Sequence, residues 1–201
     1  MKRLIVAITG ASGVIYGVRA LELLRETADV ETHLVLTPAA IRTINAELDM
    51  TGDAVRALAD HVHSHRDIGA SISSGSFVTE GMLVAPCSIK SLSGIAHSYN
   101  DELVIRAADV CLKERRRLVL MLRETPFHLG HIELMAQATR NGAIIMPPVP
   151  AFYHRPATVD DIVDQSVARA LDLFGIAAPK IMRWNGRTSE VESPEDDDPG
   201  F

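Results

Sequence analysis

The chain has 201 residues, of which 47% are hydrophobic and 23% are charged, and its formal net charge is −6. This length and composition exclude a fibrous, disordered or disulfide-dependent small protein and predict one domain with its own hydrophobic core. The acidic excess lies entirely in residues 190–201, so the preceding residues carry balanced charges and offer no electrostatic footprint for nucleic acid or an anionic membrane.

The sequence contains neither a membrane span nor a secretion signal that we can identify. No apolar run reaches the roughly 18 residues that a spanning helix needs. The first apolar stretch ends at Gly10 without a signal-type cleavage site and is interpreted as a strand. Cys87 and Cys111 are far apart in apolar surroundings, which favours reduced thiols. We therefore expect a cytoplasmic protein.

Short runs rich in Val, Ile and Leu alternate along the chain with amphipathic segments. The runs lack the polar alternation of half-exposed strands, so they predict strands that are buried on both faces. Strands that alternate with helices predict an α/β fold: a single-domain, doubly wound parallel sheet of Rossmann-like type. In chain order we expect a strand at 3–9, a helix at 14–26, a strand at 32–37, helices at 38–47 and 52–63, a strand at 82–86, helices at 88–97 and 101–114, a strand at 117–122, a helix at 128–141, a strand at 143–146 and a helix at 158–174.

The last predicted helix has clear end signals. Asp160 and Asp161 place negative charge in its first turn, and Gly175 follows its end. From Ser189 onward the chain is polar, acidic and without periodicity, which is typical of a disordered tail. We expect one domain over residues 1–188 and a tail over 189–201.

The loops that leave the strands carry the first candidate binding residues, because ligands of open parallel sheets bind at the carboxyl ends of the strands. In the turn Thr9–Gly13, Gly10 and Gly13 allow close backbone approach, and helix amides point toward an anion. The turn matches neither the dinucleotide-binding glycine pattern nor a Walker loop. The alternative is a tight turn in which Ser12 caps the following helix.

Two further loops are rich in hydroxyl groups. Residues 71–76 (Ser-Ile-Ser-Ser-Gly-Ser) could form a phosphate nest, although such a run is more often a plain surface loop. Ser88, after the predicted strand 82–86, could cap the next helix and present its hydroxyl to a ligand. Cys87 has no base beside it in the sequence, so we interpret it as a small buried residue and not as a nucleophile.

Cationic residues provide candidate anion ligands. Arg123 and Glu124 directly follow the strand 117–122; Arg123 could bind an anion while Glu124 exchanges protons, and the alternative is a surface ion pair. Arg106 and Lys113 are seven residues apart on a predicted helix and therefore share a face.

Two groups of histidines suggest metal binding but are interpreted otherwise. His61, His63 and His65 alternate at a predicted helix end, and we expect them to be exposed. His128 and His131 lie near Glu133 without a further ligand at a recognisable spacing. We therefore predict no metal site.

The motifs together resemble the UbiX-type flavin prenyltransferases, which include the small subunits of phenolic acid and hydroxyarylate decarboxylase systems. The resemblance extends from Met1 to about Trp184 and rests on the order and spacing of many short motifs. These are Thr9–Gly13 with Tyr16–Gly17, Glu47, Ser74–Ser76, Pro86–Ser88, Arg106–Val110, Leu112–Arg115, Arg123–Pro126, Pro150–Pro156, Arg169 and Arg183–Trp184.

This resemblance implies an enzyme, a prenyltransferase that joins the dimethylallyl group of dimethylallyl monophosphate to N5 and C6 of reduced FMN. The product, prenylated FMN, would serve a UbiD-type decarboxylase, in ubiquinone synthesis or in phenolic acid breakdown. The family requires no metal and forms homododecamers in which neighbouring subunits complete each site.

The resemblance also implies roles for particular residues. Glu124 corresponds to the carboxylate of proton transfer, Glu47 lies near the reactive flavin edge, and Ser12 joins them as a catalytic candidate. FMN contacts fall on Gly10, Ala11, Ser12, Gly13, Thr37, Ser88, Arg106 and Arg123. Contacts to the prenyl donor fall on Ser74, Gly75, Lys113, Arg123, Tyr153, Arg169 and Trp184. Arginine, lysine, tyrosine and serine groups suit a leaving phosphate, and aromatic walls suit an allylic cation.

Two other functions remain as alternatives. An FMN-dependent decarboxylase of the cysteine-decarboxylase type would share the fold, but it needs a histidine after the first helix, where this chain has Glu47. A non-catalytic flavin carrier subunit would bind FMN without needing the additional phosphate-binding cations.

Overall fold

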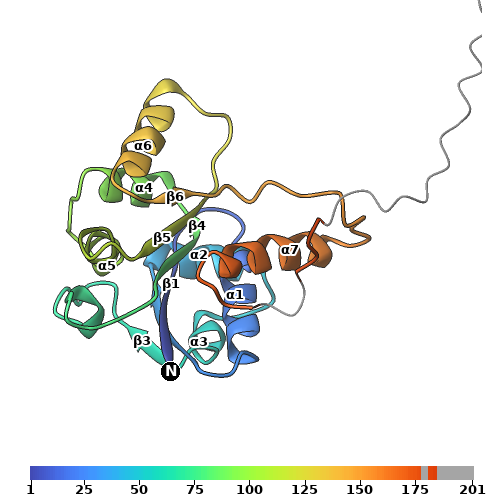
Figure 1. Ribbon diagram of the computed structural model, residues 1–201, viewed down its shortest axis with the longest axis horizontal. Helices are drawn as coiled ribbons and strands as arrows, with labels where there is room; N and C mark the ends of the chain where they lie inside the picture. The colour runs from blue at the N-terminus through green and yellow to red at the C-terminus, as the bar shows by residue number, and fades with distance from the viewer. Residues whose placement is uncertain (178–180, 185–201) are drawn as a thin grey trace, which may run out of the picture.

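The computed structural model describes residues 1–177 and 181–184. It contains one six-stranded parallel sheet with the strand order β3-β2-β1-β4-β5-β6, and helices cover both of its faces (Figure 1). The predicted doubly wound α/β fold is therefore confirmed. None of the helices in these residues has the length and apolar character needed to cross a membrane.

The observed elements follow the predicted order closely. The strands are β1 (Lys2–Ile8), β2 (Val30–Leu36), β3 (His61–His63), β4 (Gly81–Cys87), β5 (Arg117–Leu122) and β6 (Ile144–Ile145). The helices are α1 (Ile15–Arg25), α2 (Pro38–Glu47), α3 (Gly52–Arg56), α4 (Ile89–Ala96), α5 (Leu103–Lys113), α6 (Leu129–Arg140) and α7 (Val159–Asp172), with a 3-10 turn η1 (Ser71–Ser73).

One predicted element is wrong. The expected helix at 52–63 ends at Arg56, and residues 61–63 form the edge strand β3, parallel to β2. The Asp60 carboxylate explains why the chain leaves the helix and pairs with β2. It accepts hydrogen bonds from the backbone amide and the hydroxyl of Thr32 in β2, both at 2.8 Å. The pairing holds the chain beside β2, where it continues as a strand.

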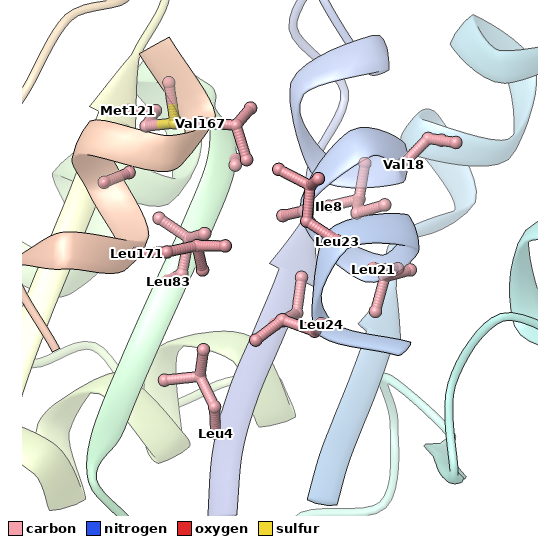
Figure 2. Packing of buried hydrophobic residues seen from close by; sticks show 14 of the residues in the cluster. Leu4, Ile8, Val18, Leu21, Leu23, Leu24, Leu83, Met121, Val167 and Leu171 are labelled. Atoms are coloured by element: carbon pink, nitrogen blue, oxygen red, sulfur yellow. The ribbon is translucent and has the colours of Figure 1, made fainter. Parts of the chain in front are cut away.

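The sheet is buried on both faces, as the apolar runs predict. In β1, Leu4, Val6 and Ile8 join a core formed with α1 and α7, while Ile5 and Ala7 face the opposite core, formed with α4 and α5. Figure 2 shows the first of these cores, with side chains of α1 and α7 meeting over β1 and β4. A fully buried Leu or Ile contributes about 1.5–3 kcal/mol relative to an exposed one.

The ends of α7 confirm the predicted signals. The side chain of Thr158 accepts from the amide of Asp161, and the Asp161 carboxylate accepts from the amide of Thr158, which completes a capping box. Gly175 follows the helix with φ of 67°, a conformation that glycine adopts readily. The predicted tail at 189–201 lies outside the described residues.

The strand order places a topological switch between β1 and β4. The chain first builds β1, β2 and β3 toward one edge of the sheet and then returns to add β4, β5 and β6 on the other side of β1. Loops that leave β1 and β4 therefore run in opposite directions and open a crevice at their carboxyl ends.

Candidate functional site

A cavity of about 460 Å³ lies at this switch and is called the switch-point cavity below. This volume is within the range of small-molecule sites. The walls come from the turn after β1, the start of α2, the start of α4 and two approaching side chains. They comprise Thr9, Gly10, Thr37, Pro38, Ala39, Arg42, His65, Ser88, Lys90, Ser91 and Glu102.

Two helix N-termini face the switch-point cavity, and each is capped by a hydroxyl. Thr37 caps α2 by accepting from the amide of Ala40 at 3.1 Å, and Ser88 caps α4 by accepting from the amide of Ser91 at 3.3 Å. Helix N-termini carry partial positive charge and unsatisfied amides, which favour a bound anion. The structure thus brings together Gly10, Thr37 and Ser88, three residues that are far apart in sequence.

Buried Thr9 fixes the relation between the two loops. Its hydroxyl donates to the carbonyl oxygen of Pro86 at 2.7 Å and accepts from the amide of Ser88 at 2.8 Å. The end of β1 is thereby tied to the start of α4, so the cavity walls are held by hydrogen bonds within the protein.

The turn Gly10–Gly13 is held by a carboxylate instead of by Ser12. Glu47 Oε2 accepts from the amides of Gly13 at 2.8 Å and of Val14 at 3.3 Å. Helix α1 has no side-chain cap, and Ser12 is exposed, so the alternative in which Ser12 caps this helix is wrong. Gly13 adopts φ of 91°, which most other residues would adopt only with strain.

Arg123 lies beside Ser88 at the end of the sheet. The strands β4 and β5 pair through Cys87 and Leu122, and the amide of Arg123 donates to the carbonyl oxygen of Cys87 at 3.1 Å. Within the described part of the chain, the exposed Arg123 side chain makes no ion pair, so the alternative of a surface pair with Glu124 is wrong. The carboxylate of Glu124 accepts from the amide of Thr125 at 3.1 Å.

A second group of predicted site residues lies along α5. Arg106 donates through Nε to the carbonyl oxygen of Ser73 at 3.2 Å and pairs with Asp109 at 3.0 Å. A Cβ atom at Gly75 would lie 2.8 Å from Nζ of Lys113, so the loop that contains Ser74 reaches this lysine. Lys113 also pairs with Glu114.

This second group is separate from the switch-point cavity within one chain. Lys113 is the last residue of α5, and β5 starts only four residues later, at Arg117. A crossover helix runs antiparallel to the strands it joins, so Lys113 lies toward their amino ends, whereas Ser88 and Arg123 lie at their carboxyl ends. Arg106 does not line the cavity either.

A third group lies on and near α7. The hydroxyl of Tyr153 donates to the carbonyl oxygen of Met182 at 2.9 Å and accepts from Gln165 at 2.8 Å. The rings of Tyr153 and Trp184 meet edge to face, 6.0 Å apart. Arg169 pairs with Asp172 at 3.0 Å, and the pKa of Asp172 is lowered by its hydrogen bonds to Arg183 and Arg169. In Figure 1 the segment between β6 and α7 extends away from the sheet.

Both cysteines are structural residues, as predicted for Cys87. Cys87 and Cys111 are free and buried, and burial raises the pKa of each thiol to about 12. At neutral pH both are protonated and shielded, so neither is an activated nucleophile.

Four ionisable residues line the cavity although the sequence does not indicate them as ligand-binding residues there: Arg42, His65, Lys90 and Glu102. Lys90 and Glu102 pair at 3.4 Å. Only Lys90 could have been inferred from the local sequence, because it lies two positions after Ser88, which the sequence predicts as a binding residue. The other three reach the cavity through the packing of α2, the segment after β3 and the start of α5, which short-range patterns do not encode.

The fold and the cavity at the topological switch define a Rossmann-like α/β protein with a small-molecule site suited to an anion. The family model described as Flavoprotein matches residues 1–171. "Flavin prenyltransferase UbiX" from Escherichia coli (strain K12) is 62% identical over 188 residues, which cover 92% of this chain and 100% of that protein. The chain therefore belongs to the UbiX-type flavin prenyltransferase family.

Two solved structures have the same fold at high sequence identity. AnUbiX (PadA1), crystallised in complex with FMN and dimethylallyl pyrophosphate, is 50% identical with a TM-score of 0.90, over 93% of this chain and 99% of that one. A dodecameric FMN-dependent UbiX-like decarboxylase from Escherichia coli O157:H7 is 52% identical with a TM-score of 0.89, over 92% and 100%. The peptidyl-cysteine decarboxylase EpiD, at 17% identity and a TM-score of 0.56, shares the fold alone.

Proposed function

We propose that this chain transfers a dimethylallyl group from a dimethylallyl phosphate to N5 and C6 of reduced FMN. The observation that carries the proposal is the switch-point cavity, where Gly10, Thr37 and Ser88 meet at two capped helix N-termini. This arrangement occurs in a chain that is 62% identical to a flavin prenyltransferase over that protein's whole length.

The residues of the cavity fit FMN. A flavin mononucleotide needs donors for a phosphate and a close backbone approach for its planar ring. Hydroxyls of Thr37 and Ser88 and the amides of two helix starts supply the donors. The turn at Gly10–Gly13 supplies the backbone approach. When bound, reduced FMN supplies the nucleophilic positions of the reaction.

The prenyl donor site requires residues from more than one copy of the chain. Lys113, Arg123, Tyr153 and Arg169 would hold the phosphate, yet one chain distributes them over three places. Assembly of neighbouring copies would bring them together, as the dodecameric relative suggests. Exposed apolar side chains at the start of α6, in the segment before α7 and at the first residue of α7 support such burial between copies: Phe127, Leu129, Ile132, Val149, Phe152 and Val159.

The roles of the side chains follow from the bonds that change. The C1–O bond of the donor would break as a C1–N5 bond forms, and N5 would lose its proton to the departing phosphate, which Lys113, Arg123 and Arg169 would hold. The ring is then closed by a bond from C3 of the prenyl group to C6. The alkene gains one proton and C6 loses one, so this second step balances. Glu124 with the retained phosphate would move these protons.

The aromatic pair would shape the donor site. Tyr153 and Trp184 lie edge to face at the end of the exposed segment, with Trp184 63% exposed. Their negative ring faces would stabilise positive charge that develops on the prenyl group. Burial of these rings against a neighbouring copy would also exclude water from the allylic centre.

Mass spectrometry of the flavin tests the proposal. The full-length protein is incubated anaerobically with reduced FMN and dimethylallyl monophosphate, and we expect the flavin mass to rise by one isoprene unit. A parallel reaction with dimethylallyl pyrophosphate asks whether the longer donor, bound by AnUbiX, is also used. An unchanged flavin mass with both donors would overturn the proposal.

The product is proposed to activate a UbiD-type decarboxylase. A protein-free filtrate of the reaction is added to such an enzyme prepared without its cofactor, and decarboxylation of an aromatic acid is measured. Activation by the filtrate, and not by FMN alone, is expected. If a filtrate that contains the prenylated flavin does not activate the decarboxylase, a UbiD-type enzyme is excluded as the recipient of the product.

The two alternatives give different outcomes in the same assays. A cysteine-type decarboxylase would release carbon dioxide from a peptide and leave the flavin mass unchanged. A flavin carrier would bind FMN equally well after Lys113→Ala or Arg169→Ala and would show no transfer. Two buried, free thiols at Cys87 and Cys111 support a cytoplasmic location, which cell fractionation would test.

A further inference from the structure

Outside the switch-point cavity, strands β2 and β3 bring together a group of metal-ligating side chains. Glu31 and His33 are two residues apart on β2, so they share one face of the sheet. His61 of β3 pairs in register with His33 and therefore stands directly beside it. We call Glu31, His33 and His61 the histidine–carboxylate cluster.

The distances within the cluster suit a small divalent ion. Nε2 of His33 lies 2.9 Å and Nε2 of His61 lies 3.8 Å from Oε1 of Glu31, and one ligand atom from each of the three residues falls within 4.8 Å of the others. A tetrahedral zinc ion with bonds of about 2.0–2.1 Å places its ligand atoms roughly 3.3 Å apart. The two measured distances lie on either side of this value.

A neighbouring histidine supports the ligating form of His33. Nδ1 of His33 lies 3.0 Å from Nε2 of His63, so a proton on Nδ1 can be donated to His63. In the structure Nε2 of His33 donates to Glu31 Oε1 at 2.9 Å, so an ion would replace this proton and leave the remaining one on Nδ1, directed at His63, as in metal-bound histidines whose second nitrogen donates to a neighbour.

The charges and the access around the cluster are also compatible with an ion. Arg3 donates to Glu31 Oε1 at 2.9 Å and lies over the ring of Phe77, so it is a competing cation on one side. The Asp60 carboxylate adjoins His61 in the chain and offsets that charge, and it accepts hydrogen bonds from Thr32. The His61 side chain is about half exposed, which leaves a path from solvent.

In contrast to the sequence-based prediction of no metal site, we propose that Glu31, His33 and His61 bind one divalent ion of the zinc class, with solvent as a further ligand. The ion would join β2 to the edge strand β3, which otherwise makes only three paired positions. His33 precedes Thr37 by four residues, about 13 Å along a strand, so the ion would lie apart from the proposed FMN site. Prenyl transfer itself would not involve it.

Metal titration of the full-length protein without a histidine tag tests this proposal. Zinc binding is measured by calorimetry at neutral pH, and cobalt is used as a second probe because its visible spectrum reports the coordination. We expect one saturable site per chain, and a rise in Tm with zinc, because ligands of the native state stabilise it. Absence of saturable binding would overturn the proposal.

Two variants locate the site. His61→Ala removes an exposed ligand without opening the core and should weaken zinc binding at least about tenfold and abolish the Tm rise. His131→Ala is the matched control. The His128 and His131 rings lie 3.6 Å apart on another surface, where a pair of histidines could bind zinc adventitiously. This control variant should bind zinc like the wild type. Equal affinity of wild type and His61→Ala, or loss of the site in His131→Ala, would contradict the assignment.

The flavin assay separates this proposal from the proposed function. Prenyl transfer by His61→Ala, with or without a chelator, should match the wild type, because His61 does not line the switch-point cavity. If the protein binds zinc as described but does not prenylate FMN, the metal-site proposal stands and only the proposed function is contradicted.

Discussion

The carboxylate of Glu47, the last residue of α2, lies 2.8 Å from the amide nitrogen of Gly13, in the turn just before α1. The same oxygen accepts from the amide of Val14, so it takes the place of the side-chain cap that α1 lacks. A single side chain thereby positions the turn after β1 relative to α2, and both border the switch-point cavity.

We predict that the hydrogen bonds and the charge of Glu47 have separable effects. Glu47→Ala should lower the free energy of unfolding by about 1 kcal/mol, the usual effect of losing a helix cap. Glu47→Gln retains an acceptor oxygen, so it should keep most of this stability. It should slow prenyl transfer if, as the family resemblance implies, the Glu47 charge lies near the reactive edge of the flavin. Chemical denaturation and flavin mass measurement provide the two readings. A wild-type rate of prenyl transfer by Glu47→Gln would show that the charge of Glu47 does not contribute to the reaction.

The two caps at the cavity should matter for FMN as well as for stability. Thr37→Ala and Ser88→Ala should each cost about 1 kcal/mol of stability and weaken FMN binding about tenfold or more, because each also loses a phosphate donor. Thr51→Ala is the matched control, since Thr51 caps α3 through the amide of Ala54 but does not line the cavity. It should lose stability and bind FMN normally. Equal FMN affinity in all three variants would place the phosphate elsewhere.

The buried thiols predict a specific dependence on pH. The pKa of Cys87 and of Cys111 rises from 9.0 to about 12 in the folded protein, so the native state holds both protons to higher pH than the unfolded chain. Stability should therefore be fully present below pH 9 and fall as the pH rises toward 12. Urea denaturation at pH 8 and pH 10 measures this, and a Cys87→Ala, Cys111→Ala double variant should show a smaller decrease.

The same burial should block thiol chemistry. A thiol-specific reagent at pH 8 should leave the native protein unmodified and react with both cysteines after unfolding. Rapid modification of the native chain would contradict the burial of these side chains.

Glu124 is predicted to act on protons and not on binding. Glu124→Gln should bind FMN as tightly as the wild type but form prenylated flavin at least about a hundredfold more slowly, the usual range for losing a general acid or base. The pH dependence of the remaining rate should also change. A Glu124→Gln variant with an unchanged rate and pH profile would exclude this role.

The sequence predicts the fold well because apolar periodicity encodes it locally. The strand at 117–122 and the helix at 38–47 match the observed bounds, since each is a continuous pattern with clear ends. The edge strand β3 escapes prediction because three residues with one apolar side chain, Val62, carry no periodic signal. Its pairing depends on contacts between Asp60 and Thr32, which lie 28 positions apart.

The candidate site is predictable only in part. Gly10, Thr37 and Ser88 each follow a strand, and the rule for parallel sheets places such residues at one edge, as found. The link from Glu47 to Gly13 and the cluster around His33 depend on tertiary packing that no short motif records. Lys113 and Arg169 illustrate a further limit of local patterns, because in the proposed site their partners would belong to other copies of the chain.

The central claim is that copies of this chain build each prenyl-transfer site together. Lys113→Ala and Arg123→Ala remove residues that one chain places at opposite ends of the strands, Lys113 before β5 and Arg123 after it. Each variant alone should assemble normally, as measured by light scattering, and should produce almost no prenylated FMN.

Co-expression of these two variants is the most direct test. If a site takes Lys113 from one subunit and Arg123 from another, random mixing restores both residues in about a quarter of the sites. The account therefore predicts prenylated FMN at about a quarter of the wild-type rate by mass spectrometry. Mixed assemblies as inactive as either parent would contradict it.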